Sequence, residues 1–198
     1  MRLGWRTRGL SFRSVPALSA ETEGSQIVEF AVSLPLLVVF VVGIFDFGSA
    51  FTLKQKIENA ALGAARIAAS QPTRDLSVAG CPESVCAIRD AVANGFAASK
   101  VNACGLGSAT PVRSGLTWTF TANTGCPDTL TLAINRGHTY PATLASPFVA
   151  NYTIEATKVT ISYPYRWQFS NVIKLVSPGA NYAGTSQITS VAVVQNVN

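Results

Sequence analysis

The chain has 198 residues, of which 48% are hydrophobic and 13% are charged, against about 25% charged residues in an ordinary soluble protein. This length suits one folded domain with appendages, and the composition excludes an intrinsically disordered chain, which needs low hydrophobicity and high charge. The net charge of +5 permits acidic partners without requiring them, while one His and four Cys leave few ligands for a metalloenzyme.

An uncharged segment from Phe30 to Phe45 is the first predicted element. Apolar residues resume after Asp46 and continue to Leu53, which gives about 24 residues in all. At a rise of about 1.5 Å per residue, such a helix crosses a hydrocarbon core of about 30 Å. The run has no polar face at helical period, so it predicts a membrane-spanning helix rather than a core helix of a soluble domain.

Basic residues around this segment predict its orientation. Lys54 and Lys56 follow the span, whereas four arginines precede it: Arg2, Arg6, Arg8 and Arg13. The excess before the span favours a cytoplasmic N-terminus and places the chain after about residue 54 outside the cytoplasm. A signal peptide cleaved near residues 48–50 is the alternative, although its apolar region is usually only about 7–15 residues long.

Two acids lie at or within the apolar segment. Glu29 stands at its entry and Asp46 inside it, about 25 Å apart along a helix. A carboxylate at this depth costs a few kcal/mol unless it reaches the interface, is protonated or finds a partner. Two interpretations stay open: each acid is solvated at the interface, or each pairs with a cation of a neighbouring chain and so fixes the axial register of an assembly. Pro35 is expected to kink the helix, because it removes one backbone donor.

Residues 24–30 read GSQIVEF and lead directly into the apolar segment. This sequence resembles the processing site of type IV prepilins, in which a prepilin peptidase cleaves after the Gly and the fifth mature residue is Glu. The resemblance implies cleavage between Gly24 and Ser25. It also implies that Glu29 neutralises the new α-amine of a neighbouring subunit during assembly.

Three further strings, VEFAVSLPLL, GIFDFGSAF and NAALGAARIAA, are similar to TadE-like minor pilins, or pseudopilins, of tight-adherence (Flp-type) pili. The resemblance covers about residues 24–70. It implies a leader peptide over 1–24, a transmembrane and extended helix over 25–70, and an extracytoplasmic α+β domain over 71–198. The implied protein is a non-catalytic, single-pass protein of the bacterial inner membrane with a periplasmic C-terminal domain, and its incorporation in an extracellular pilus stays open. The implied partners are the prepilin peptidase, other pilin and pseudopilin subunits, the inner-membrane assembly platform and membrane lipid.

The remaining chain predicts a small antiparallel sheet packed on helix, which is a pilin-like α+β fold. The first helix is expected to run from about Ser25 to Ala69, with an Ala-rich face that packs on its own sheet, on another helix, or on both. A second helix is expected over 83–99. Period-two alternation predicts about four strands, near 116–121, 129–134, 159–163 and 188–194, separated by turns at 125–128, 135–137 and 177–179.

All four cysteines lie beyond the span, on the side predicted to be oxidising: Cys81, Cys86, Cys104 and Cys126. An even number in this compartment predicts two disulfides, and three pairings are possible. We favour Cys81–Cys86 and Cys104–Cys126, because each closes a local loop. A zinc site is the alternative, but it normally shows two close Cys pairs and here only one pair is close.

The sequence offers no active-site motif. His138 is expected in an exposed loop, and neither a Gly-x-Ser-x-Gly elbow nor a P-loop is present, so no enzyme, metal or cofactor is predicted. The aromatic segment 163–167 suits core packing or a binding surface. Without a clustered basic patch, no specific nucleic acid is expected. The rival hypotheses are a bitopic inner-membrane protein with a periplasmic binding or sensing domain, and an extracytoplasmic enzyme on a membrane anchor.

Overall fold

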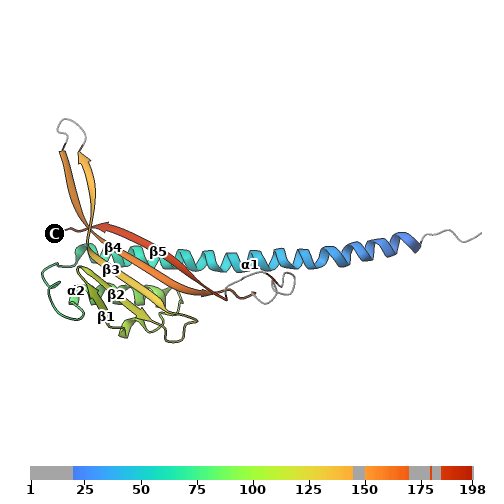
Figure 1. Ribbon diagram of the computed structural model, residues 1–198, viewed down its shortest axis with the longest axis horizontal. Coiled ribbons are helices and arrows are strands. Elements are labelled where there is room, and N and C mark those ends of the chain that lie inside the picture. The colour runs from blue at the N-terminus through green and yellow to red at the C-terminus, as the bar shows by residue number, and fades with distance from the viewer. Residues whose placement is uncertain (1–19, 145–149, 170–178, 180–183, 198) are drawn as a thin grey trace, which may run out of the picture.

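The computed structural model describes residues 20–144, 150–169, 179 and 184–197. A long helix, α1 (Ala20–Ser70), projects from a globular part that contains the second helix, α2 (Glu83–Ala98), a short 3-10 turn (Leu106–Ser108) and a sheet (Figure 1). The described strands of the sheet are β1 (Pro111–Ser114), β2 (Thr117–Ala122), β3 (Leu130–Leu144), β4 (Ala150–Arg166) and β5 (Thr185–Gln195). The chain is therefore α+β, as the sequence predicts.

The sheet is an antiparallel meander in which each strand pairs with the next along the chain, in the order β1-β2-β3-β4-β5. Both helices pack against it, α1 along β4 and β5 and α2 beside α1. Large side chains that alternate along the strands fill the space under the helices, among them Trp118, Phe120, Leu132, Ile134 and Ile161. The residues between them along each strand, many of them Thr, lie on the other face of the sheet. This alternation is expected of a sheet with one face packed on the core and the other toward solvent.

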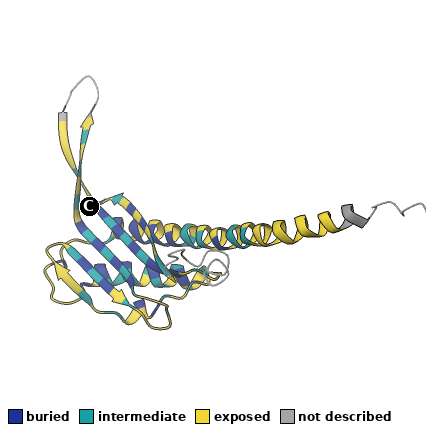
Figure 2. Cartoon of the chain, turned by 45° about the vertical axis from the view of Figure 1, so that its right-hand side comes forward, coloured by how far each residue is buried: buried dark blue, intermediate teal, exposed yellow. Residues whose placement is uncertain are grey.

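The two halves of α1 have different surroundings (Figure 2). The half nearest the N-terminus is exposed, whereas an Ala-rich face of the second half is buried against the domain. This face consists of Ile57, Ala60, Ala61, Ala64, Ala65 and Ala68. The helices approach closely where Gly95 of α2 meets Ala60, since a Cβ added at Gly95 would lie 3.3 Å from the Ala60 Cβ. The Ala-rich face therefore packs within its own chain.

Two features of the sheet differ from the predictions. The sequence predicts about four strands, but the described residues form five, because β1 is a short edge strand whose Val112 is its one aliphatic residue. The predicted turn at 135–137 is wrong: β3 continues through it, and the register shifts between Asn135 and His138 as a bulge. The Asn135 Oδ1 accepts the Gly137 N–H at 2.9 Å, so the residues that signal a turn close a bulge within the strand.

Beyond this bulge, β3 and β4 leave the sheet as a two-stranded arm (Figure 1). The arm pairs His138 with Ala156 at its base and Leu144 with Ala150 near its tip. His138 therefore lies half-buried in a strand rather than in an exposed loop. Residues 1–19 of the predicted leader and most of the predicted turn at 177–179 lie outside the described residues.

Candidate functional site

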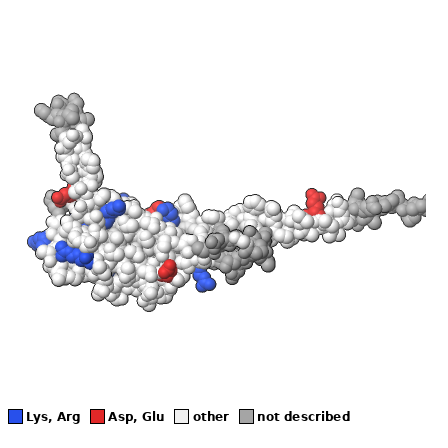
Figure 3. Space-filling model, viewed as in Figure 1, with Lys and Arg blue, Asp and Glu red and all other residues white. Residues whose placement is uncertain are grey.

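The projecting half of α1 is an apolar surface that its own domain leaves uncovered. Phe30 is 64% exposed and Ile44 is 71% exposed, with many aliphatic and aromatic residues exposed between them. Figure 3 shows this stretch almost free of charged side chains on the face in view. It belongs to the one described helix, Gly24–Ser70, that is long and apolar enough to cross a membrane, and none of its most apolar window is buried. One N-terminal apolar helix of this kind fits a single-pass membrane protein.

The predicted processing residues lie on this exposed stretch. Gly24, Ser25 and Glu29 are all exposed and all helical, since α1 begins at Ala20 rather than near Ser25. A Cβ added at Gly24 would meet nothing within 4 Å, so no packing within the chain requires a glycine there. Pro35 lies inside α1, which runs without a break from Ala20 to Ser70.

Asp46 has a different environment from Glu29, because it is only 2% exposed. Its Oδ1 accepts the backbone N–H of Gln168 at 3.1 Å, and its Oδ2 accepts the backbone N–H of Phe169 at 3.2 Å. Its own carbonyl accepts the Tyr165 hydroxyl at 3.2 Å. The sequence suggested that Asp46 meets solvent or a cation of another chain, whereas the structure supplies its partners from the end of β4. Two backbone N–H donors stabilise a buried carboxylate, whereas burial of a carboxylate without hydrogen bonds is costly.

Aromatic rings surround this contact. Trp167 packs edge-on against Phe47 of α1 and against Tyr165, with ring centroids 5.3 and 5.2 Å away. Its indole N–H donates to the Ser186 hydroxyl at 2.6 Å. Trp and Tyr favour the membrane–water interface, so this end of the domain suits a position at the membrane surface. The sequence allowed either core packing or a binding surface for the aromatic segment 163–167. In the structure its rings connect the sheet to α1.

Arg136 holds the C-terminal end of α1 against the sheet. No sequence pattern singled out this residue. From the bulge of β3 its guanidinium donates to the Ala68 carbonyl, to the Gln71 carbonyl at 2.8 Å and to the Pro72 carbonyl at 3.3 Å. It also donates to the Thr157 hydroxyl at 3.0 Å. Burial lowers the pKa of Arg136, and the nearby carboxylate of Asp75 opposes that effect. A cation that caps the last carbonyls of a helix also complements its dipole.

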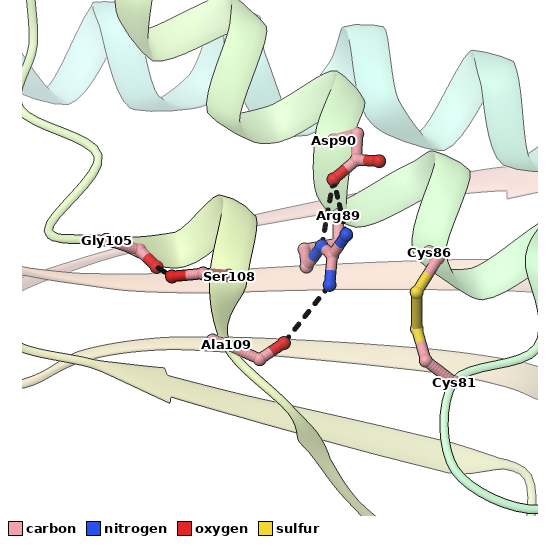
Figure 4. A network of polar contacts seen from close by, with 7 residues as sticks. All are labelled: Cys81, Cys86, Arg89, Asp90, Gly105, Ser108 and Ala109. Carbon is pink, nitrogen blue, oxygen red and sulfur yellow. Dashed lines mark hydrogen bonds and ion pairs between the residues drawn. A yellow bond between two sulfur atoms is a disulfide. The ribbon is translucent and has the colours of Figure 1, made fainter.

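The structure joins Cys81 to Cys86 and Cys104 to Cys126, the pairing that local loop closure favours. Figure 4 shows the first of these disulfides at the start of α2. In the same view Arg89 pairs with Asp90 at 2.8 Å and donates to the Ala109 carbonyl at 3.1 Å. These contacts connect α2 to the segment that precedes β1, on the side of the domain away from the sheet's open face.

The described residues contain no group of three or more His, Cys, Asp or Glu side chains that suits a metal ion. With both Cys pairs joined as disulfides, no thiolates are available for the alternative zinc site. The candidate functional features of the described residues are therefore the exposed apolar half of α1 and the contacts of Asp46 and Arg136 that fasten this helix to the domain.

Most of this helix also matches a family model. Residues 24–66 match the model described as TadE-like protein. Over this segment the chain is similar to TadE-like proteins. The match begins at Gly24 and ends in the Ala-rich part of α1, so it covers the exposed apolar half, Asp46 and most of the buried face. Comparison with curated proteins and with solved structures found no match.

The TadE-like match supports a protein associated with a tight-adherence pilus, in a family that is generally not enzymatic. It also suggests association with other components of that pilus. The globular part from 71 onward lies outside the match, and its role rests on its own structure.

Proposed function

We propose that this chain is a minor pilin or pseudopilin that a prepilin peptidase cleaves between Gly24 and Ser25 and that then takes part in assembly of a tight-adherence pilus. The observation that carries the proposal is the TadE-like helix with its apolar half uncovered by its own domain. In the precursor that half anchors the chain in the inner membrane. In an assembly the same surface packs against the helices of other subunits.

The division of the chain follows from this role. Residues 1–24 form the leader, 25–70 the helix, and 71–198 a periplasmic domain. Because Asp46 and Arg136 fasten the domain to α1 at two separate places, the domain moves with the helix when the helix enters a filament.

Glu29 differs from Asp46 in this proposal. It is exposed, and no hydrogen bond or ion pair within the described part of the chain satisfies its carboxylate. Cleavage at Gly24 creates an α-amine four residues away from it. We assign Glu29 to pairing with the α-amine of a neighbouring subunit, because a carboxylate among packed apolar helices requires a cationic partner.

The decisive experiment is the N-terminal sequence and intact mass of the protein purified from its membrane, with and without the prepilin peptidase. The proposal expects a mature chain that starts at Ser25 only when the peptidase is present. Gly24→Leu should abolish cleavage, and Gly43→Leu is the matched control, since an added Cβ meets nothing within 4 Å at either position. A leader retained with the peptidase present would instead favour a bitopic anchor with a binding domain, and a start near residue 50 would favour a secreted protein.

Assembly is tested separately with Glu29→Gln. This variant should be cleaved normally, because it leaves the residues at the cleaved bond unchanged, but it should be depleted from sheared pili. Equal amounts of wild-type and Glu29→Gln protein in the pilus fraction would contradict the role assigned to this carboxylate.

A further inference from the structure

A cavity of about 600 Å³ opens beside α1 just beyond its most apolar stretch. Ile44, Gly48, Thr52 and Lys56, each four residues after the last, line one wall and therefore lie on one face of the helix. Lys100, which follows α2, and Tyr163 of β4 contribute to the opposite wall. The cavity thus lies between the helix and the end of the domain nearest the apolar half.

Polarity changes along this wall. Ile44 continues the exposed apolar surface of α1, whereas Lys56 stands about 18 Å further along the helix. A headgroup region adds about 5–8 Å to each side of the hydrocarbon core. The apolar end of the wall therefore lies at the depth of acyl chains when Lys56 lies at or just above the headgroups.

The charge of the cavity is positive and uncompensated. None of the described residues that line it is Asp or Glu. The ion pairs of the described residues are Lys54–Glu58 and Arg89–Asp90, so neither Lys56 nor Lys100 has an acidic partner there. The Thr52 hydroxyl donates to the Gly48 carbonyl at 2.8 Å, and the Tyr163 hydroxyl donates to the Asn102 carbonyl at 3.0 Å. The ammonium groups are the remaining strong donors for an anion.

We infer that this cavity binds an anionic phospholipid, with the phosphate between Lys56 and Lys100 and the upper acyl chain along Ile44 and Phe45. A soluble anion would use the two lysines but not the apolar end of the wall. The joined apolar and cationic surfaces match a molecule that has both. The inference requires only that α1 spans a membrane, so it stands or falls independently of cleavage at Gly24 and of pilus assembly.

The test uses the full-length protein in phosphatidylcholine vesicles that contain a trace of photoreactive phosphatidylglycerol, or of the matching photoreactive phosphatidylcholine. Labelled positions are mapped by peptide mass spectrometry. The expected result is preferential labelling of the cavity walls by phosphatidylglycerol. Because one basic residue near an anionic surface contributes about fivefold to binding, Lys56→Gln with Lys100→Gln should reduce this labelling about twenty-fivefold.

Two matched controls separate a site from general attraction. Arg74→Gln with Lys158→Gln removes the same charge from the other end of the domain and should leave labelling unchanged. Gly48→Leu fills the cavity without changing charge, since a Cβ there meets nothing within 4 Å, and should abolish labelling, whereas Gly43→Leu should not. If Gly48→Leu labels as wild type does, the cavity is not the site.

Competition identifies the source of the phosphate. Excess soluble glycerol 3-phosphate should not displace the lipid, because it lacks the acyl chain. Displacement at millimolar concentration would show a soluble-anion site and overturn the inference. Equal labelling by the two lipids, or full labelling of the double lysine variant, would overturn it as well.

Discussion

The carboxylate of Asp46 accepts a hydrogen bond from the backbone N–H of Gln168 at 3.1 Å, across 122 residues of chain. An acid that interrupts an apolar helix thereby ties that helix to the end of β4. Because its own chain buries and satisfies it, Asp46 needs no partner from lipid, water or a second subunit. In the proposed assembly, register is therefore assigned to the exposed acid of the same helix, Glu29.

Replacing Asp46 tests this tie. Asp46→Ala leaves two backbone N–H groups without acceptors and should lower the free energy of unfolding by about 1–3 kcal/mol. Asp46→Asn keeps one acceptor oxygen and should lose less. Urea titration of the full-length protein in detergent micelles, followed by tryptophan fluorescence, reports the change because Trp167 lies next to the contact. Glu58→Gln on the exposed face of α1 is the control and should change stability by less than about 1 kcal/mol; equal losses for Asp46→Ala and Glu58→Gln would refute the tie.

Local patterns predicted the parts of this fold that depend on local contacts. Uniform hydrophobicity and Ala content predicted α1, alternation predicted the central strands, and short loops favoured the disulfide pairing that the structure shows. The partners of Asp46 are backbone groups more than 120 residues away, and a backbone N–H carries no sequence signal. Asn135-Arg136-Gly137 has the composition of a turn, and only the paired strand β4 shows it to be a bulge that aims Arg136 at α1.

Two glycines, one outside and one inside the contact between α1 and α2, predict opposite effects of substitution on stability. Gly63 is exposed in α1 with open space around an added Cβ, so Gly63→Ala should stabilise the protein by about 0.5–1 kcal/mol through helix propensity. Gly95 faces Ala60 at 3.3 Å, so Gly95→Leu should destabilise it by about 1–3 kcal/mol through overpacking. Thermal unfolding followed by circular dichroism measures both. A stable Gly95→Leu variant would mean that the helices separate readily.

The Asp75 carboxylate predicts a pH dependence. Burial raises its pKa, but hydrogen bonds from the Ser84 backbone N–H and hydroxyl, each 2.8 Å long, outweigh burial, so that its pKa lies below the ordinary value. A lowered pKa in the folded state gives stability that is complete above the unfolded pKa of about 3.9 and is lost as the pH falls through the folded pKa. Unfolding free energies measured between pH 7 and 2 should therefore fall less steeply below about pH 4 in Asp75→Asn than in wild type. Asp128→Asn, at an exposed position, is the control for removal of one carboxylate.

Arg136 makes the last prediction, because one side chain donates to three carbonyls at and just beyond the end of α1. Arg136→Met leaves the carbonyls of Ala68 and Gln71 without this donor and should cost about 2–4 kcal/mol of unfolding free energy, while Arg136→Lys should recover only part, since a single ammonium cannot reproduce the planar fork. Loss of the cap also frays the helix end, so amide hydrogen exchange should accelerate in the last turn of α1 before it does so near Asp46. Arg66→Met, an exposed position on the same helix, is the control for loss of one charge. Unchanged exchange at the end of α1 in Arg136→Met would show that Pro72 and the packing of the Ala-rich face end the helix without Arg136.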